Sequence, residues 1–315
     1  MLHQLLKIQY PIIQGAMANI ATAKFAAAVS NAGALGVIGT GAMTPELARA
    51  AIEECRTLTN QPFAVNVMLM NPHSDAIMDI ICELKPAVVT TGAGNPGKYI
   101  EKLKSNGILV VPIVPTVGLA RRMEQAGADM LIVEGTEAGG HVGELTTMAL
   151  VPQVVDAVKI PIIAAGGIAD GRGYVAALAL GAIGVQVGTC LLVADECPIH
   201  DNYKQAILDA KDTDTVVTGR SVSAPVRIKK NAMSQKYLKL EQAGAVRDDL
   251  EKLTLGSLRK AVFDGDMENG SVMMGQIAGM IKERKSLAQI FADMTQDAKQ
   301  VYGHIESNVN GVGHV

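Results

Sequence analysis

The chain has 315 residues, of which 49% are hydrophobic and 19% charged, and its formal net charge is −3. This length suits one barrel-sized domain with additions, or two ordinary domains. The charge offers no basic field for nucleic acid, and no run reaches the roughly 18 apolar residues that span a bilayer, so we expect neither a nucleic-acid nor a membrane partner.

The four cysteines are Cys55, Cys82, Cys190 and Cys197, and they form neither a CxxC pair nor a metal-ligand spacing. Free thiols are typical of a reducing compartment. Residues 1–14 lack the apolar core of a signal peptide. We therefore expect a cytoplasmic protein.

The dominant pattern along the chain is an alternation of short apolar runs with longer segments of helical spacing. The runs are rich in Val and Ile and apolar on both faces, as buried parallel strands are. They are Pro11–Gln14, Leu35–Gly39, Phe63–Met68, Ala87–Gly92, Leu109–Val114, Met130–Gly135, Pro161–Gly167 and Gly184–Thr189.

Helix signals lie between these runs. Thr44 followed by Pro45 is a start signal, because the threonine can cap the helix and proline fits its first position. Helix stop signals recur at Gly33, Gly107, Gly127 and Gly181, where glycine permits the left-handed conformation that ends a helix. Eight strand–helix units without a break predict an α/β fold of the (β/α)8 TIM-barrel type.

The alternation stops after Thr189. Residues 200–267 are more polar and show no strand–helix repeat, so we predict that they form a cap on the substrate side. Ser286 and Gln289 have the spacing of a capping box, before a helix whose apolar face runs from Leu287 to Val301. The predicted organisation is a barrel of residues 1–199 and 268–315, with a C-terminal helix, and the cap of residues 200–267.

The loops after the seventh and eighth runs are rich in glycine, and barrel enzymes place their sites in the loops after the strands. Gly166 and Gly167 end the seventh run, and Gly188 and Thr189 end the eighth. Glycine lets the backbone approach a phosphate with exposed N–H groups. A tight turn would explain either loop alone, but two such loops after neighbouring strands favour a phosphate site.

The loop after the sixth run, residues 134–143, carries a histidine among four glycines. The imidazole of His141 titrates near neutrality and is therefore suited to proton transfer. A lone histidine is more often structural, but the flanking glycines and the position after a strand favour a catalytic role. We call residues 134–143 the His141 loop.

Two further positions face the same end of the predicted barrel. Asn66 is a polar residue within the third run and needs a partner, either a planar ligand or an internal hydrogen bond. Gly15, Ala16 and Met17 follow the first run and form either a backbone platform for such a ligand or an ordinary turn.

Two other barrel chemistries lack the residues that they need. None of the eight runs contains a lysine, which argues against a Schiff-base aldolase. Glu134 and Glu137 have no histidine pair beside them, which argues against a metal-centred mechanism. No metal site is therefore predicted.

The loop motifs resemble those of the nitronate monooxygenase (2-nitropropane dioxygenase-like) flavoproteins. The shared segments are Gln14–Met17, Asn66, the Glu-Ala-Gly-Gly-His run ending at His141, Ala164–Gly171 and Gln186–Thr189. Within this family the chain looks most like the flavin-dependent enoyl-[acyl-carrier-protein] reductases of type II. That likeness rests on Thr90–Pro96, Leu145–Met148, His200–Lys204, Val226–Asn231 and Gly270–Gly279. Departures at Ala16, Asn19 and Cys190 bear on substrate preference.

The resemblance implies an FMN enzyme with His141 as its catalytic residue. The implied phosphate site is Gly166, Gly167, Gly188 and Thr189, and the implied ring site is Ala16, Met17, Asn66, Gln186, Gly139 and Gly140. Gly15, Glu134 and Val187 complete the predicted cofactor-binding residues. Members of the reductase branch use NADH or NADPH, can be assisted by a monovalent cation and are commonly dimers, so we expect the same here.

The resemblance thus predicts reduction of trans-2-enoyl thioesters carried by acyl carrier protein in fatty acid synthesis. The carrier is acidic, and residues 215–240 contain six basic and no acidic side chains, which form either a docking patch or a solvated face. These are Arg220, Arg227, Lys229, Lys230, Lys236 and Lys239. Two alternatives stay open: a nitronate monooxygenase that uses O2 and no NAD(P)H, and a regulatory flavin- or nucleotide-binding protein without catalysis.

Overall fold

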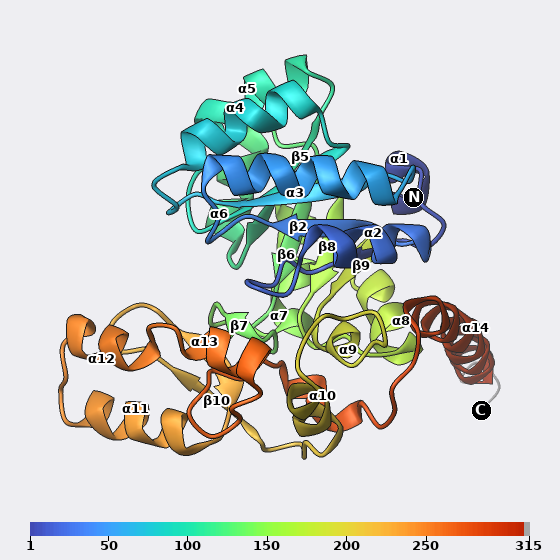
Figure 1. The fold of residues 1–315 in the computed structure, drawn as a ribbon. Coiled ribbons are helices and arrows are strands. Elements are labelled where there is room, and N and C mark those ends of the chain that lie inside the picture. The colour runs from blue at the N-terminus through green and yellow to red at the C-terminus, as the bar shows by residue number, and fades with distance from the viewer. Residues whose placement is uncertain (312–315) are drawn as a thin grey trace.

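The computed structural model describes residues 1–311, in which eight parallel strands form a barrel (Figure 1). The strands follow the order β1-β9-β8-β6-β5-β4-β3-β2 around it. They are β1 (Ile12–Gln14), β2 (Gly36–Gly39), β3 (Phe63–Met68), β4 (Val88–Gly92), β5 (Leu109–Val114), β6 (Leu131–Glu134), β8 (Ile162–Ala165) and β9 (Gly184–Val187). Every predicted run contains one of these strands, and the predicted (β/α)8 fold is confirmed.

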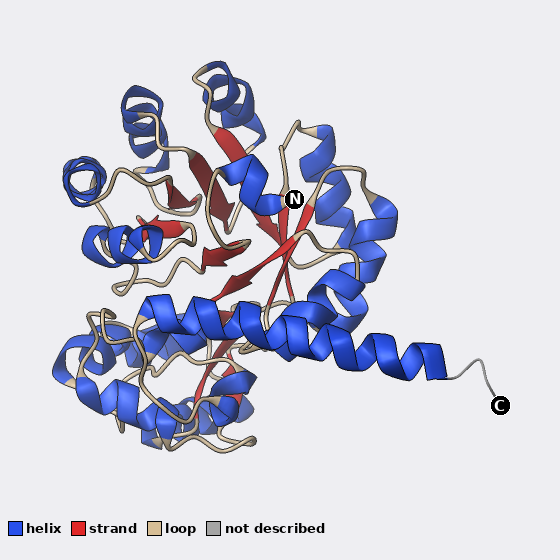
Figure 2. Ribbon diagram, turned by 90° about the vertical axis from the view of Figure 1, so that its right-hand side faces the viewer, coloured by secondary structure: helices blue, strands red, loops and turns tan. Residues whose placement is uncertain are grey.

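Helices between the strands cover the outside of the barrel (Figures 1 and 2). They are α2 (Ala23–Asn31), α3 (Pro45–Leu58), α4 (Ser74–Leu84), α5 (Gly97–Ser105), α6 (Val117–Gln125), α7 (Thr147–Ala157), α8 (Gly171–Ala179) and the short α9 (Thr189–Leu192). The predicted start of α3 is present, since Thr44 Oγ1 accepts from the Leu47 amide. Helix α1 (Leu2–Leu6) packs Leu2 and Leu6 into the barrel interior. Of the described helices, none has the length and apolar character that a bilayer-spanning segment needs.

The buried side chain of Gln14 completes the closure between β1 and β2. The two strands share only short backbone pairing, in which Leu35 N–H donates to Ile12 O and Gln14 N–H donates to Leu35 O, both at 2.9 Å. One step further, Gln14 Nε2 donates to Val37 O and Gln14 Oε1 accepts from Val37 N–H, each at 3.2 Å. The side-chain amide thus takes the place of a backbone peptide in the sheet.

Replacing Gln14 by leucine is therefore expected to destabilise the barrel while keeping its interior volume. The change leaves the N–H and C=O of Val37 buried without partners, and each such group costs about 1–3 kcal/mol. We expect the free energy of unfolding, measured in urea, to fall by about 2–4 kcal/mol. The exposed Gln125→Leu is the control and should change it by less than about 0.5 kcal/mol; equal effects of the two changes would refute this role of Gln14.

The cap (residues 200–267) carries a small sheet and its own apolar cluster. Its elements are α10 (Asp201–Leu208), β10 (Thr215–Thr218), β11 (Val226–Lys229), α11 (Ala232–Gln242), α12 (Arg247–Thr254), α13 (Ser257–Arg259) and the π-helix Lys260–Asp264. Ile228, Met233, Tyr237 and Leu250 form the cluster. Helix α10 instead packs Tyr203 into the barrel core. The division of the chain into barrel and cap stays a prediction, and residues 312–315, which it includes, lie outside the described part.

The antiparallel pairing within the cap and onto the barrel was not predicted. Strand β11 pairs with β10 on one side and on the other with β7 (Gly140–His141), which belongs to the His141 loop. Strands β7 and β11 come from segments about 85 residues apart in the chain. The pairing places the cap directly against the loop that carries the predicted catalytic histidine, as Figure 1 shows for β7 and β10.

The C-terminal helix α14 (Leu287–Gly311) follows a short 3-10 helix, Gln276–Met280. It packs beside α8 and projects beyond the barrel (Figure 2). Leu287, Phe291 and Met294 of the predicted apolar face are buried. The predicted capping box is only half formed: Ser286 Oγ accepts from the Gln289 amide, but the Gln289 side chain donates to Asp293 instead of turning back.

Candidate active site

A layer of polar side chains lines the carboxyl end of the barrel interior. Below it the interior is apolar, with inward residues that alternate along the strands. These are Ile13, Val37, Ala64, Val88, Val111, Ile132 and Ile163. Two residues further along their strands come Asn66, Thr90 and Glu134, and Gln186 faces the same interior because it pairs with Ile13 and Ala165. Sequence spacing alone therefore brings four polar groups together above a hydrophobic floor.

Asn66 has an internal partner within this layer. Its Nδ2 donates to Thr90 Oγ1 on the neighbouring strand at 2.9 Å. This is the internal hydrogen bond that the sequence left open as an alternative to a ligand. Within the described residues the Oδ1 of Asn66 accepts no hydrogen bond, so it stays available to a donor on a bound ring.

Glu134 is the one acid of the layer, and its carboxyl forms no hydrogen bond or ion pair with any described residue. Its partner across the sheet in β8 is Ala165, and the residues of β5 that pair with β6 just before Glu134, Ile113 and Val114, are also uncharged. Burial raises the pKa of the Glu134 carboxyl from 4.5 to about 7. A carboxyl of this kind is partly protonated at neutral pH and can donate a hydrogen bond to a ligand.

The raised pKa predicts a pH-dependent stability of the protein without cofactor. The folded state binds the Glu134 proton more tightly than the unfolded chain does. The contribution of Glu134 to the free energy of unfolding is therefore greatest below pH 4.5, and it declines as the pH rises through about 7. Urea unfolding between about pH 5 and pH 8 should show this decline. Glu134→Gln should remove it, whereas the exposed Glu101→Gln should not; parallel curves for all three proteins would contradict the assignment.

The two glycine-rich loops meet at the ends of β8 and β9, which pair through Ala165 and Gln186. Gly166 and Gly167 have φ angles of 91° and 74°, in the left-handed region that favours glycine. Within residues 1–311, the backbone N–H groups of Gly166, Gly167, Gly188 and Thr189 donate to no protein acceptor. Free amides that converge from two adjacent loops fit a phosphate group. The residues present thus suit the phosphate end of FMN.

The first loop lies beside the second of these two. Gly15 N–H donates to Val187 O at 2.8 Å, and Met17 Sδ lies 3.8 Å from where a Cβ on Gly188 would stand. A Cβ on Gly188 would meet no other atom within 4 Å, so the space above this glycine is open. The structure therefore brings Gly15, Met17, Val187 and Gly188 to one place; cofactor contact by these residues and by Ala16 stays a prediction.

The His141 loop reaches the same end of the barrel. Gly140 has a φ of 78°, and a Cβ on Gly139 would stand 2.7 Å from the backbone of Met274, so the loop and residues 274–275 approach closely. The imidazole of His141 is accessible to solvent, but the surrounding protein disfavours its charged form and holds its pKa below the ordinary 6.5. At neutral pH His141 is therefore a neutral imidazole that can both donate and accept.

Two residues join the His141 loop to the glycine-rich loop after β8. The sequence did not single them out for a role. The Glu137 carboxylate accepts from Thr147 N–H at 2.9 Å and from Thr147 Oγ1 at 3.0 Å. Thr147 Oγ1 also lies 2.9 Å from Gly166 O and 3.2 Å from Ala165 O. Both residues stand in segments quoted for the family resemblance, which was the only available signal, since the contact spans separate loops.

The docking interpretation of the basic residues needs one correction. Arg227 is 6% exposed, and its guanidinium donates to the carbonyl of Thr136 and to the hydroxyl of Thr215. Its side chain is therefore buried between the cap and the His141 loop and is not part of a surface patch. Lys230, Lys236 and Lys239 are exposed as predicted, whereas Lys229 is half-buried.

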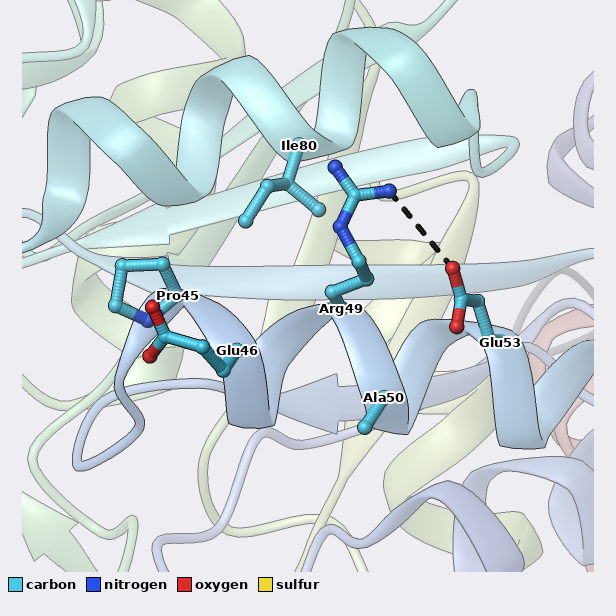
Figure 3. A pocket seen from close by; sticks show the side chains of 6 residues that line it. All are labelled: Pro45, Glu46, Arg49, Ala50, Glu53 and Ile80. Atoms are coloured by element: carbon cyan, nitrogen blue, oxygen red, sulfur yellow. Dashed lines mark ion pairs between the residues drawn. The ribbon is translucent and has the colours of Figure 1, made fainter.

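A shallow hollow of about 230 Å³ lies elsewhere, on the outer face between α3 and α4 (Figure 3). It is lined by Pro45, Glu46, Arg49, Ala50, Glu53 and Ile80. Arg49 forms ion pairs there with Glu53 and Glu83. Because α3 and α4 cover the outside of the barrel, this hollow is separate from the polar layer.

Comparisons with known proteins agree with this arrangement over nearly the whole chain. The nitronate monooxygenase family model matches residues 1–79 and 72–297. A probable nitronate monooxygenase of Staphylococcus saprophyticus is 34% identical, covering 91% of this chain and 94% of its own. FabK from Thermotoga maritima is 46% identical over 98% of both chains, with a TM-score of 0.95. The nitroalkane oxidase of Streptomyces ansochromogenes is 27% identical over 96% of this chain and 99% of its own, with a TM-score of 0.85.

Proposed function

Because the chain belongs to the nitronate monooxygenase family of flavin-dependent oxidoreductases, we propose that it is an FMN-dependent enoyl-[acyl-carrier-protein] reductase that uses NADH or NADPH. The observation that carries this choice is the degree of likeness to FabK, an enoyl-acyl-carrier-protein reductase: its 46% identity exceeds the 27% identity of the nitroalkane oxidase over a similar share of the chain.

The proposed FMN site uses the two glycine-rich loops and the polar layer. The free amides of Gly166, Gly167, Gly188 and Thr189 would bind the phosphate. The ring would lie over Asn66, Glu134 and Gln186, with Gly15, Ala16, Met17, Val187, Gly139 and Gly140 around it. Bound FMN would supply the hydride relay from NAD(P)H to the β-carbon of the enoyl thioester.

His141 would act on the substrate at the other side of this site. When the β-carbon receives a hydride, negative charge moves to the thioester oxygen and the α-carbon then takes a proton. A neutral imidazole can donate its N–H to that oxygen, directly or through one water. The overall change consumes one NAD(P)H and one proton and yields the saturated thioester and NAD(P)⁺.

Three accompanying properties belong to the same proposal. The co-substrate is NADH or NADPH, a monovalent cation assists, and the protein is a homodimer. Reduction of the flavin with each nucleotide tests the co-substrate. Activity in potassium, sodium and tetramethylammonium salts tests the cation, and analytical ultracentrifugation tests the homodimer.

The acyl carrier protein would dock on the exposed lysines of the cap. Lys230 and Lys236 are exposed and form no ion pair with described residues. Reversing both charges in Lys230→Glu with Lys236→Glu should raise the KM for the carrier-bound substrate by about tenfold at low salt, because the carrier is acidic. The KM for a neutral N-acetylcysteamine thioester should stay unchanged.

A control reverses the charge of one lysine elsewhere on the surface. Lys299→Glu alters an exposed lysine of α14, away from the cap, and should leave both KM values as they are. Docking on the cap is wrong if the double variant keeps the parental KM and salt dependence with the carrier-bound substrate.

The decisive test of the proposed function follows the flavin without oxygen. NADH or NADPH should bleach the visible flavin band, and a crotonyl thioester added afterwards should restore it. Bleaching without recovery on any enoyl thioester would refute the reductase.

A nitronate monooxygenase is the alternative, favoured by the likeness to the probable nitronate monooxygenase of Staphylococcus saprophyticus. It predicts no bleaching by either nucleotide and oxygen uptake with a nitronate. In that reaction His141 would act as a base or ligand beside the nitroalkane carbon.

A further inference from the structure

Arg227 is a buried cation without an acidic partner. Its Nε and Nη2 donate to Thr136 O at 3.1 and 3.0 Å, and its Nη1 donates to Thr215 Oγ1 at 3.0 Å. Among residues 1–311 no carboxylate lies within ion-pair distance of the guanidinium. Its hydrogen-bond acceptors are all neutral, and Arg220 and Glu137 act on the guanidinium from a greater distance in opposite directions. Burial of a charge without an ion pair is costly. The fixed fork of the guanidinium, however, defines the position of a carbonyl better than a single donor does.

The carbonyl that receives this fork belongs to the His141 loop. Thr136 lies near the start of the loop and His141 near its end. The end of the loop is bound by the same cap strand, since Val226 pairs with His141 and Arg227 pairs with Gly140. Val142 N–H also donates to Pro225 O at 3.2 Å. One strand of the cap, β11, therefore binds the loop at both ends, by its backbone at one and by the Arg227 side chain at the other.

The barrel alone leaves this loop less constrained. Between Thr136 and Gly140 lie Glu137, Ala138 and Gly139, of which Glu137 is bonded to Thr147 and to the amide of Gln276. The glycines of the remaining stretch allow many conformations when its attachments are lost. The hydroxyl of Thr136 is buried without a partner, so the carbonyl and not the hydroxyl carries the attachment at this residue. Thr136 N–H also donates to Leu145 O at 2.8 Å, so removal of the guanidinium would loosen the start of the loop from the cap, not from the barrel, and allow water to approach the imidazole.

We propose that Arg227 is a positioning residue, through which the cap sets the place and the surroundings of the His141 imidazole. The inference rests on the proposed role of His141 in the reaction. It assigns the cap a part in catalysis besides the binding of the carrier protein.

The test is the titration of His141 by NMR in the FMN-bound enzyme, with the imidazole signal assigned by its loss in His141→Ala. In Arg227→Met, which has similar length and no charge, the pKa of His141 should rise toward its ordinary value because the imidazole is better hydrated. kcat should fall by about 10–100-fold while KM changes little, since a displacement of about 1 Å can cost that much. Arg227→Lys should give intermediate values for both.

Lys211→Met is the control, because it removes a positive charge from an exposed position of the cap that lies outside β11 and outside the six basic residues considered for docking. It should leave the titration and kcat unchanged. If Arg227→Met does not fold, Thr215→Val removes one partner of the guanidinium and should shift the pKa of His141 in the same direction by less. An unshifted His141 in the Arg227 and Thr215 variants overturns the inference, whatever reaction the enzyme catalyses, because the titration needs no turnover.

Discussion

Replacing His141 by alanine is expected to lower the turnover of an enoyl thioester by about 10²–10⁴-fold while FMN stays bound. The amides proposed to bind the phosphate lie on other loops, so the variant should keep its yellow colour and its rate of reduction by NAD(P)H. Only the second half of the reaction, reoxidation by the enoyl thioester, should slow. Stopped-flow measurement of the two halves separates these effects.

A second variant distinguishes how the imidazole acts. His141→Gln keeps an N–H donor but cannot titrate, and it should recover part of the turnover if a hydrogen bond to the thioester oxygen is the main contribution. Because the pKa of His141 lies below its ordinary value and both forms of the imidazole carry an N–H, the activity of the parent should be constant around neutral pH and change only in acid, where the imidazole titrates. That acid limb should be absent from His141→Gln.

The control for both variants is His304→Ala, which changes an exposed histidine of α14. Its kinetics should match those of the parent. Turnover of His141→Ala within a few-fold of the parent would exclude His141 from the chemistry, and loss of FMN from that variant would mean that the histidine contributes to the cofactor site instead.

Gly188→Ala is expected to weaken FMN binding by about 100-fold without unfolding the protein. A Cβ at this position meets only Met17 Sδ, at 3.8 Å, so the folded chain without cofactor can accept it. The methyl group would stand in the open space above the loop, where the phosphate is proposed to lie. Loss of two charge-assisted hydrogen bonds at about 1.5 kcal/mol each amounts to this factor.

The measurement is a fluorescence titration of the apoprotein with FMN, together with the melting temperature of the apoprotein. Gly118→Ala is the control, since a Cβ there meets no atom within 4 Å and the residue lies in helix α6, away from the proposed phosphate site. Equal FMN affinity in Gly188→Ala and the parent would place the phosphate elsewhere. A lower melting temperature of the Gly188→Ala apoprotein alone would show that the open space is needed by the fold.

Much of the fold could be predicted because its signals are local. A buried parallel strand appears in the sequence as a short apolar run. A glycine such as Gly33 or Gly181 ends the helix before the next strand, whichever strands that strand pairs with. Eight repeats of this local pattern leave few other folds. The positions of the two glycine-rich loops and of His141 followed, because in such a barrel each loop after a strand lies at the same end.

What the sequence could not provide were properties that depend on partners distant in the chain. Gln14 reads as one polar residue after an apolar run, and its role in the sheet exists only because Val37 lies opposite. Glu134 reads as an ordinary acid, and its raised pKa comes from the apolar strands around it.

Arg227 is the clearest case of this difference. In the sequence it is one of six basic residues in a stretch without acidic residues, and arginine is usually exposed at the surface. Its burial follows from the pairing of β11 with β7, and that pairing joins segments about 85 residues apart. Local patterns therefore specify which elements form and where their loops lie, because they depend on neighbours in the chain. Burial, protonation and the contact between the cap and the His141 loop depend on packing that no local pattern encodes.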